Sequence, residues 1–132
     1  MEIFIDTSAL FALINEADYD HEAAQDLWDH LTDTDDMLIC NNYIIVECLA
    51  LLQNRLGMEA VQLLQNIILP CFRVQWIGEE EHTSIVHDLL SANRRNLSLV
   101  DCASFETMRR LGINTVFAFD EHFCEQGFKV IP

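Results

Sequence analysis

The sequence predicts an α/β fold in which helices cover both faces of a parallel sheet. Short apolar runs typical of buried strands alternate with longer segments of helical periodicity. Strands that are separated by helices pair in parallel, and a parallel sheet is covered on both faces. No linker-like segment, internal repeat or low-complexity tract divides the 132 residues, so we expect one domain spanning residues 1–132.

The first part of the chain predicts two strands and two helices. Residues 1–5 contain the apolar run Ile-Phe-Ile of a buried strand, and residues 8–14 have helical spacing with Ser8 near the cap. Residues 20–33 predict an amphipathic helix in which acidic side chains surround an apolar stripe. That stripe consists of Ala23, Ala24, Leu27, Trp28 and Leu31. Residues 37–40 predict the second strand.

The middle of the chain predicts two consecutive helices. Either Asn41 or Asn42 is a suitable N-cap for a helix that continues to about Arg55. Gly57 then breaks the helix, since glycine is a poor helix former, and a second helix follows until Pro70.

The last part predicts three strands and two helices. Residues 72–77 alternate as a strand does, and residues 79–92 form a helix whose first turn is acidic, as the helix dipole favours. Residues 98–111 form the next helix, which begins at a serine cap and ends just before a glycine. Residues 115–119 and 128–131 are the final strands, so we expect a sheet of about five strands.

The charge balance is strongly acidic. Seven Lys and Arg stand against 22 Asp and Glu, for a formal net charge of -15. Taken alone, this argues against nucleic acid as a partner, because phosphate contacts need basic side chains. The acidity either serves solubility or faces a basic partner or a cation.

Cysteine usage and hydropathy indicate a cytoplasmic protein. The five cysteines are an odd set without a C-x-x-C pair, which predicts a reducing compartment and no structural zinc. The N-terminus lacks the basic and small-residue signals of a secretory leader. The most apolar run is short and contains Glu47, so we expect a buried helix and no membrane span.

Four acids stand beside apolar neighbours. Asp6 ends the first strand and Asp120 ends the strand at 115–119, although an aspartate in a turn after a strand is common. Glu47 lies on an apolar helix face, unless its carboxylate reaches water at the edge of that face. Asp101 follows Ser98 at the spacing of a capping box, which is the alternative to a functional role.

These four acids are expected to converge at the carboxyl edge of the sheet, where ligands of such folds bind. Carboxylates that lie close together need a cation to remain ionised. Oxygen ligands without histidine or cysteine favour Mg²⁺ or Mn²⁺ over zinc, and such an ion can activate water and stabilise charge on a phosphoryl group. The set therefore predicts metal-assisted hydrolysis of phosphodiester bonds.

Four segments resemble a PIN-domain ribonuclease, and most closely the VapC-type toxins of bacterial toxin–antitoxin pairs. They are "FIDTSAL", "NNYIIVECLALLQNR", "LSLVDCASFETMRRLGI" and "VFAFDEHFCEQGFKVI", in that order along nearly the whole chain. The resemblance implies a three-layer α/β/α sandwich and Mg²⁺- or Mn²⁺-dependent cleavage of RNA. By motif position it implies that Asp6 and Asp101 are metal ligands and that Glu47 and Asp120 complete the catalytic set.

The resemblance assigns smaller parts to other residues. Ser8 and Ser98 match hydroxyl positions near the site, and His122 is expected to be a surface or packing residue. Family members form homodimers and pair with a protein antitoxin, so both partners are implied here. The few basic residues include Arg94-Arg95, so the RNA surface is small or is completed by a second subunit. The acidic helix at 18–36 either receives a basic antitoxin segment or is a solvated face.

Other classes fit the residues less well. A haloacid-dehalogenase-type phosphatase needs D-x-D, but Ser8 occupies the second acidic position. A receiver domain needs a lysine after a late strand, whereas Lys129, the only lysine, lies within the last strand. Two alternatives within the family remain open: an RNA-processing nuclease without a toxin role, and a catalytically silent module that binds a partner.

Overall fold

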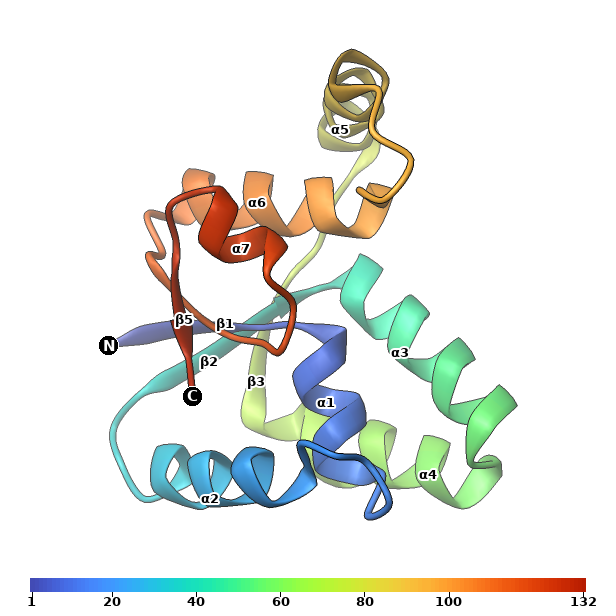
Figure 1. Ribbon diagram of the computed structural model, residues 1–132, viewed down its shortest axis with the longest axis vertical. Helices are drawn as coiled ribbons and strands as arrows, with labels where there is room; N and C mark the ends of the chain where they lie inside the picture. Colours follow the sequence, from blue (N-terminus) through green and yellow to red (C-terminus); the bar gives the residue numbers. More distant parts are fainter.

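A computed structural model, which describes residues 1–132, contains a five-stranded parallel sheet of order β3-β2-β1-β4-β5. The central strand β1 (Glu2–Ile5) pairs with β2 (Met37–Asn41) and with β4 (Thr115–Phe117). The edge strands are β3 (Phe72–Gln75) and β5 (Lys129–Ile131). The predicted α/β class, the parallel sheet and the number of strands are confirmed (Figure 1).

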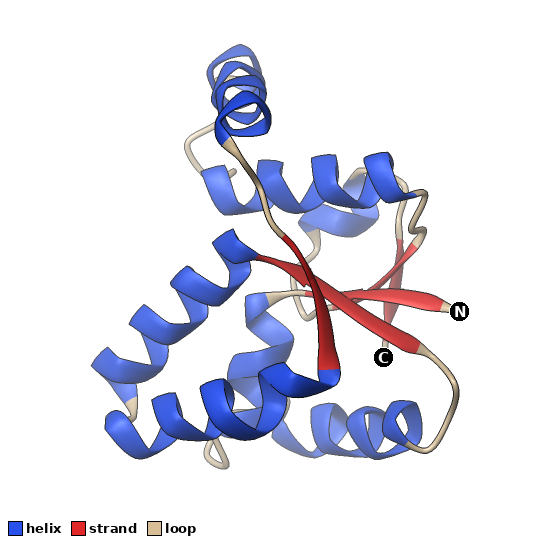
Figure 2. Cartoon of the chain, turned by 180° about the vertical axis from the view of Figure 1, so that it is seen from behind, coloured by secondary structure: helices blue, strands red, loops and turns tan.

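Helices cover both faces of this sheet, as Figures 1 and 2 show. The layer on one face contains α1 (Thr7–Ile14), α2 (His21–Thr32), α3 (Asn42–Arg55) and α4 (Met58–Leu63). The layer on the other face contains α6 (Leu99–Leu111) and α7 (His122–Glu125). The remaining helix, α5 (Glu79–Ala92), packs on the outer side of α6. The arrangement is the predicted three-layer sandwich with one additional outer helix.

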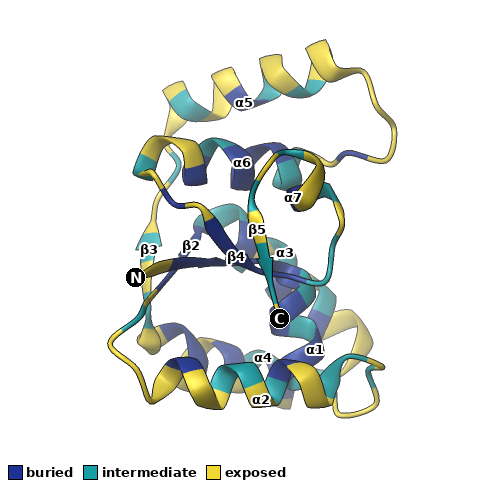
Figure 3. Ribbon diagram, turned by 60° about the vertical axis from the view of Figure 1, so that its left-hand side comes forward, coloured by how far each residue is buried: buried dark blue, intermediate teal, exposed yellow.

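The core lies between the sheet and these layers. It contains 30 buried hydrophobic residues, and Ile3, Phe4 and Ile5 of β1 are wholly buried because both sheet faces are covered. Only Ile85 of α5 is buried, so that helix is mostly exposed (Figure 3). The core thus places β1 and β4 at the centre of the fold.

Several predicted boundaries are wrong by one or two residues. The strands expected at 72–77 and 115–119 end at Gln75 and Phe117. Two residues beyond each of these ends, a backbone N–H group bonds to a side chain: Ile77 N donates to Asn42 Oδ1 at 2.6 Å, and Phe119 N donates to Ser8 Oγ at 3.0 Å. These tertiary bonds end the strands earlier than the apolar pattern does.

Two helical segments also differ from prediction. The helix expected to continue to Pro70 is divided into α4, a π-helical segment η1 (Leu64–Ile68) and a short turn η2 (Leu69–Cys71). The four-residue helix α7 was not predicted from the sequence, because it is too short to show a period.

Asn41 connects the two helices that carry functional candidates. Its side-chain Oδ1 accepts a hydrogen bond from Ile44 N at 2.9 Å, so Asn41 is the N-cap of α3. Its Nδ2 donates to Thr107 Oγ1 of α6 at 3.0 Å. Asn41 is wholly buried, and this pair of bonds fixes α3 against α6 at the end of β2.

The cysteines are all free thiols, of which Cys40, Cys48 and Cys102 are buried. No helix combines the length and the apolar character that crossing a membrane requires.

Candidate active site

The four predicted acids come together at the carboxyl edge of the sheet. Asp6 directly follows β1, and Asp120 follows the adjacent parallel strand β4. Asp101 lies in the first turn of α6, and Glu47 lies in α3. The charges of Asp101 and Asp120 raise the pKa of both Asp6 and Glu47, which places all four carboxylates within electrostatic reach.

Asp6 is the deepest of these carboxylates, with 5% of its surface exposed. It is also the N-cap of α1: its Oδ2 accepts hydrogen bonds from Ser8 N at 3.1 Å and from Ser8 Oγ at 2.5 Å. The expectation that Ser8 lies near the cap is therefore refined, because the capping side chain belongs to Asp6. Since Ser8 Oγ also accepts the bond from Phe119 N, it connects Asp6 to the loop that carries Asp120.

Burial raises the pKa of Asp6 from 3.8 to about 6, and Asp101 and Asp120 contribute to the increase. The two hydrogen bonds from Ser8 oppose it, because they favour the ionised form. Ionising a carboxylate in this environment costs stability, and a neighbouring cation would reduce that cost.

Asp101 has the capping geometry that its spacing with Ser98 indicated. Asp101 Oδ2 accepts a bond from Ser98 N, and Ser98 Oγ accepts a bond from Asp101 N, both at 3.0 Å. The cap and the site use the same side chain, because Asp101 Oδ2 also lies 3.5 Å from His122 Nδ1. The two interpretations of Asp101 are therefore compatible.

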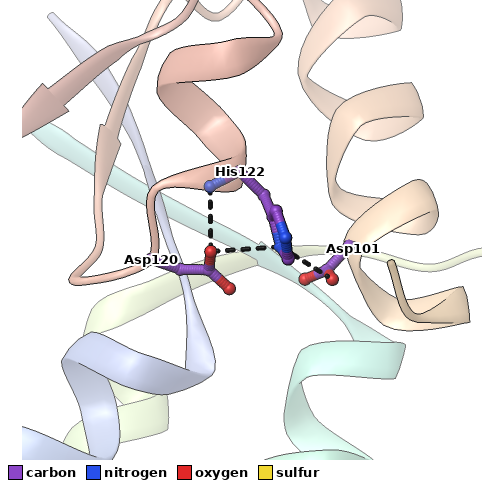
Figure 4. Close-up of side chains that lie close together, drawn as sticks. All are labelled: Asp101, Asp120 and His122. Atoms are coloured by element: carbon purple, nitrogen blue, oxygen red, sulfur yellow. Dashed lines mark hydrogen bonds and ion pairs between the residues drawn. The ribbon is translucent and has the colours of Figure 1, made fainter. Parts of the chain in front are cut away.

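A compact group of ligand atoms is formed by Asp101, Asp120 and His122 (Figure 4). One ligand atom of each residue lies within 4.8 Å of the others. Asp120 Oδ1 accepts a hydrogen bond from His122 N at 2.9 Å and lies 3.2 Å from His122 Nδ1. This ring nitrogen is buried and makes no well-aligned hydrogen bond, so it faces both carboxylates without being satisfied.

His122 is the residue that the sequence failed to assign. Only 13% of the His122 side chain is exposed and its ring faces two predicted site residues, so the expected surface position is wrong, whereas the expectation of a metal site without histidine ligands stays a prediction. The available signal was its position two residues after Asp120, within a helix that the sequence did not predict.

Glu47 is partly buried on α3, outside the group formed by Asp101, Asp120 and His122. Burial raises its pKa, and Asp101 and Asp120 raise it further. This carboxylate is therefore partly withdrawn from water, and its place in the site stays a prediction.

The donor set fits a divalent cation. Three aspartates and one glutamate supply hard oxygen donors, which suit Mg²⁺ and Mn²⁺. The unsatisfied Nδ1 of His122 adds one imidazole nitrogen, a ligand that Mn²⁺ accepts more readily than Mg²⁺. Burial and the charges of Asp101 and Asp120 raise the pKa of Asp6 and Glu47. A divalent ion stabilises the ionised form of carboxylates in such an environment.

An α/β/α sandwich with acids gathered at the carboxyl edge of a parallel sheet defines a class of open α/β domains whose ligands bind at that edge. Within that class, this chain belongs to the PIN-domain family: the family's sequence profile, described as "PIN domain", matches residues 3–129.

The chain is similar to VapC-type proteins over almost its full length. It is 32% identical over 127 residues to the 23S rRNA-specific endonuclease VapC20 of Mycobacterium tuberculosis, in two strains, covering 96% of this chain and 95% of the relative. The predicted family and its VapC-type branch are confirmed.

Solved structures agree with this assignment. The crystal structure of Mycobacterium tuberculosis VapC20, titled a sarcin-ricin loop cleaving toxin, superposes with a TM-score of 0.85 at 32% identity, covering 98% of this chain and 99% of that one. The structure of FitAcB from Neisseria gonorrhoeae matches with a TM-score of 0.69 at 18% identity, covering 100% and 97% of the two chains, and supports the fold.

Proposed function

We propose that this chain is an Mg²⁺- or Mn²⁺-dependent endoribonuclease that acts as the toxin of a toxin–antitoxin pair. The observation that carries the proposal is the group of Asp101, Asp120 and His122 within 4.8 Å, with the buried Asp6 and the partly buried Glu47 beside it. Membership of a nuclease family and the similarity to a ribosomal RNA endonuclease support the reaction class.

Asp6 and Asp101 are the proposed principal metal ligands, with Asp120 and the Nδ1 of His122 next to them. A bound divalent cation supplies a nucleophilic water at neutral pH and stabilises negative charge on the phosphoryl group. Ser8 positions Asp6 through its two hydrogen bonds, and Ser98 positions Asp101 through the capping box.

Glu47 is the proposed proton acceptor. Its raised pKa brings it nearer to the working pH than a free glutamate, as general bases require. His122 holds Asp120 in place through its backbone N–H, and its ring nitrogen Nδ1 lies 3.2 Å from Asp120 Oδ1 and 3.5 Å from Asp101 Oδ2.

RNA contact in so acidic a chain depends on where the few cations lie. Three of them form ion pairs with acids of this chain: Arg73, Arg94 and Arg110. Arg95 is exposed, forms no ion pair, and precedes the helix whose first turn carries Asp101. Its neighbour Arg94 contacts Glu125 of α7 at 3.2 Å, which places this loop beside the site. We infer that Arg95 contacts an RNA phosphate.

The biological assignment follows from the VapC-type relatives. Since VapC20 is a 23S rRNA-specific endonuclease, ribosomal RNA is the substrate to test first. A basic antitoxin segment, a homodimer and a cytoplasmic location complete the proposal. The acidic outer surfaces suit a basic protein partner, with a net charge of -15.

The test is cleavage of 23S rRNA and of unrelated RNAs by the purified protein, freed of any antitoxin, in Mg²⁺, in Mn²⁺ and in EDTA. We expect specific cuts in either metal and none in EDTA. Cleavage that persists in EDTA contradicts the metal assignment, and no cleavage under any condition favours the catalytically silent module. Cleavage without growth arrest on expression favours an RNA-processing role over a toxin role.

A further inference from the structure

A groove adjoins the acid cluster on the side of α3. It has a volume of about 440 Å³, within the range of about 300–1,000 Å³ typical of small-ligand sites. Its lining comes from α3, from α5 and from the start of α6: Asn42, Tyr43, Val46, Glu47, His82 and Val100. Glu47 belongs both to this groove and to the proposed active site, so the two are continuous.

The walls of the groove are fixed by side-chain bonds. Asn42 accepts a hydrogen bond from Ile77 N at 2.6 Å and donates to Ile77 O at 3.4 Å, which connects α3 to the loop before α5. The Tyr43 hydroxyl contacts His82 Nδ1, and the two rings meet edge to face with centroids 5.8 Å apart. The two rings therefore form one contiguous aromatic part of the groove lining.

We propose that this groove receives an unpaired RNA base next to the scissile phosphate, with the Tyr43 ring as its stacking platform. This proposal rests on the proposed ribonuclease function and deepens it. Tyr43 and Glu47 are four residues apart on α3, so they share one helix face. A base against Tyr43 leaves its own phosphate near Glu47 and the other acids.

The chemistry of the lining favours a base over a phosphate or a charged peptide. No Lys or Arg lines the groove, so nothing there neutralises a phosphate. Val46 and Val100 are apolar, while Tyr43 and His82 are aromatic side chains of the kind on which bases stack. Asn42 is already engaged with Ile77, so the groove selects unpaired nucleotides mainly by shape and stacking.

The experiment uses a short RNA that the wild-type protein cuts at a mapped position. Each nucleotide that flanks the cut is replaced in turn by an abasic one, and kcat/KM is measured for wild type and for Tyr43→Leu. We expect one abasic position to lower kcat/KM by about 5- to 150-fold in wild type, the range of a stacked base. Tyr43→Leu should lower kcat/KM equally on the intact RNA and should show no further loss on that abasic RNA.

Two variants separate stacking from other effects. Tyr43→Phe keeps the ring and removes the contact with His82, so it should restore most of the activity that Tyr43→Leu loses. Tyr19→Leu makes the same chemical change at a fully exposed tyrosine outside the groove and should match wild type. If Tyr43→Leu fails to fold, His82→Ala tests the same groove from an exposed position, with at least an approximately fivefold loss expected.

Wild-type kcat/KM for both Tyr43→Leu and His82→Ala on the intact RNA overturns the proposal. The proposal is also overturned if the loss of kcat/KM caused by the substitution and the loss caused by the abasic nucleotide are fully additive in free energy when the two changes are combined. A change of oligomeric state or antitoxin affinity, with unchanged cleavage, assigns the groove to a protein interface instead. A wild-type protein that cuts no RNA overturns the proposed function itself. That outcome is distinct from cleavage by the wild-type protein that the groove substitutions leave unchanged.

Discussion

The buried carboxylate of Asp6 should make the metal-free protein less stable as the pH rises. Its pKa is about 6 in the folded chain and 3.8 as an ordinary aspartate, because burial disfavours the anion. The folded state therefore binds more protons than the unfolded state between these values, and stability is lost as the pH rises through them. At about 1.36 kcal/mol for each pH unit, the full difference is about 3 kcal/mol.

Asp6→Asn removes this penalty while keeping the structural role. Asparagine caps helices as well as aspartate does, and its oxygen can still accept the bond from Ser8 N. In EDTA we expect Asp6→Asn to be more stable than wild type by about 0.5 kcal/mol at pH 4 and about 3 kcal/mol at pH 7. The larger figure corresponds to a melting-temperature gain on the order of 10 °C.

The assay is urea unfolding of wild type and Asp6→Asn in EDTA at several pH values between 4 and 8. Asp26→Asn is the matched control, because it removes one negative charge from an exposed position on α2. Adding Mn²⁺ should stabilise wild type and not Asp6→Asn, since the ion needs the ionised side chain. A gain that is independent of pH, or equal to that of Asp26→Asn, refutes the argument from burial.

Three further outcomes follow from the site. Asp101→Asn should abolish cleavage with little change in melting temperature. Ser98→Ala should instead cost about 1 kcal/mol of stability and keep measurable cleavage. Full activity in Asp101→Asn would leave only the capping role for Asp101. Glu47→Gln should stabilise the metal-free protein and reduce the melting-temperature gain from Mn²⁺, and identical gains in both proteins remove Glu47 from the site. Arg95→Ala should weaken RNA binding and reduce the salt slope by about 1, whereas the distant Arg55→Ala should not.

The fold was accessible from sequence because burial leaves an apolar pattern, which is periodic where one face is buried and continuous where both faces are buried. The run Ile3 to Ile5 is apolar throughout, since helices cover both faces of β1. Strand ends were less accessible, because Asn42 and Ser8 capture the backbone N–H groups of Ile77 and Phe119 across the fold. No local pattern reports such a bond.

The site was partly accessible for a related reason. Asp6 and Glu47 stand out because each interrupts an apolar pattern, and Asp120 repeats the position of Asp6 after a neighbouring strand. His122 interrupts nothing, and its role arises only from the turn that directs it at Asp101 and Asp120. The catalytic and metal roles of these residues remain predictions, while their positions are now described.

Net charge and local charge lead to opposite conclusions about RNA. A charge of -15 predicts repulsion, yet that repulsion acts over distance and is screened beyond about 8 Å at physiological salt. Contacts at the site act within a few ångströms, where a divalent cation offsets the charge of the carboxylates and Arg95 can contact a phosphate directly.

Added salt weakens the Arg95 contact but also screens the repulsion, so the two effects oppose each other. An acidic chain with one free arginine beside its site should therefore bind RNA with a shallower salt dependence than a basic nuclease, and it should depend more on stacking in the groove beside Glu47 than on phosphate contacts.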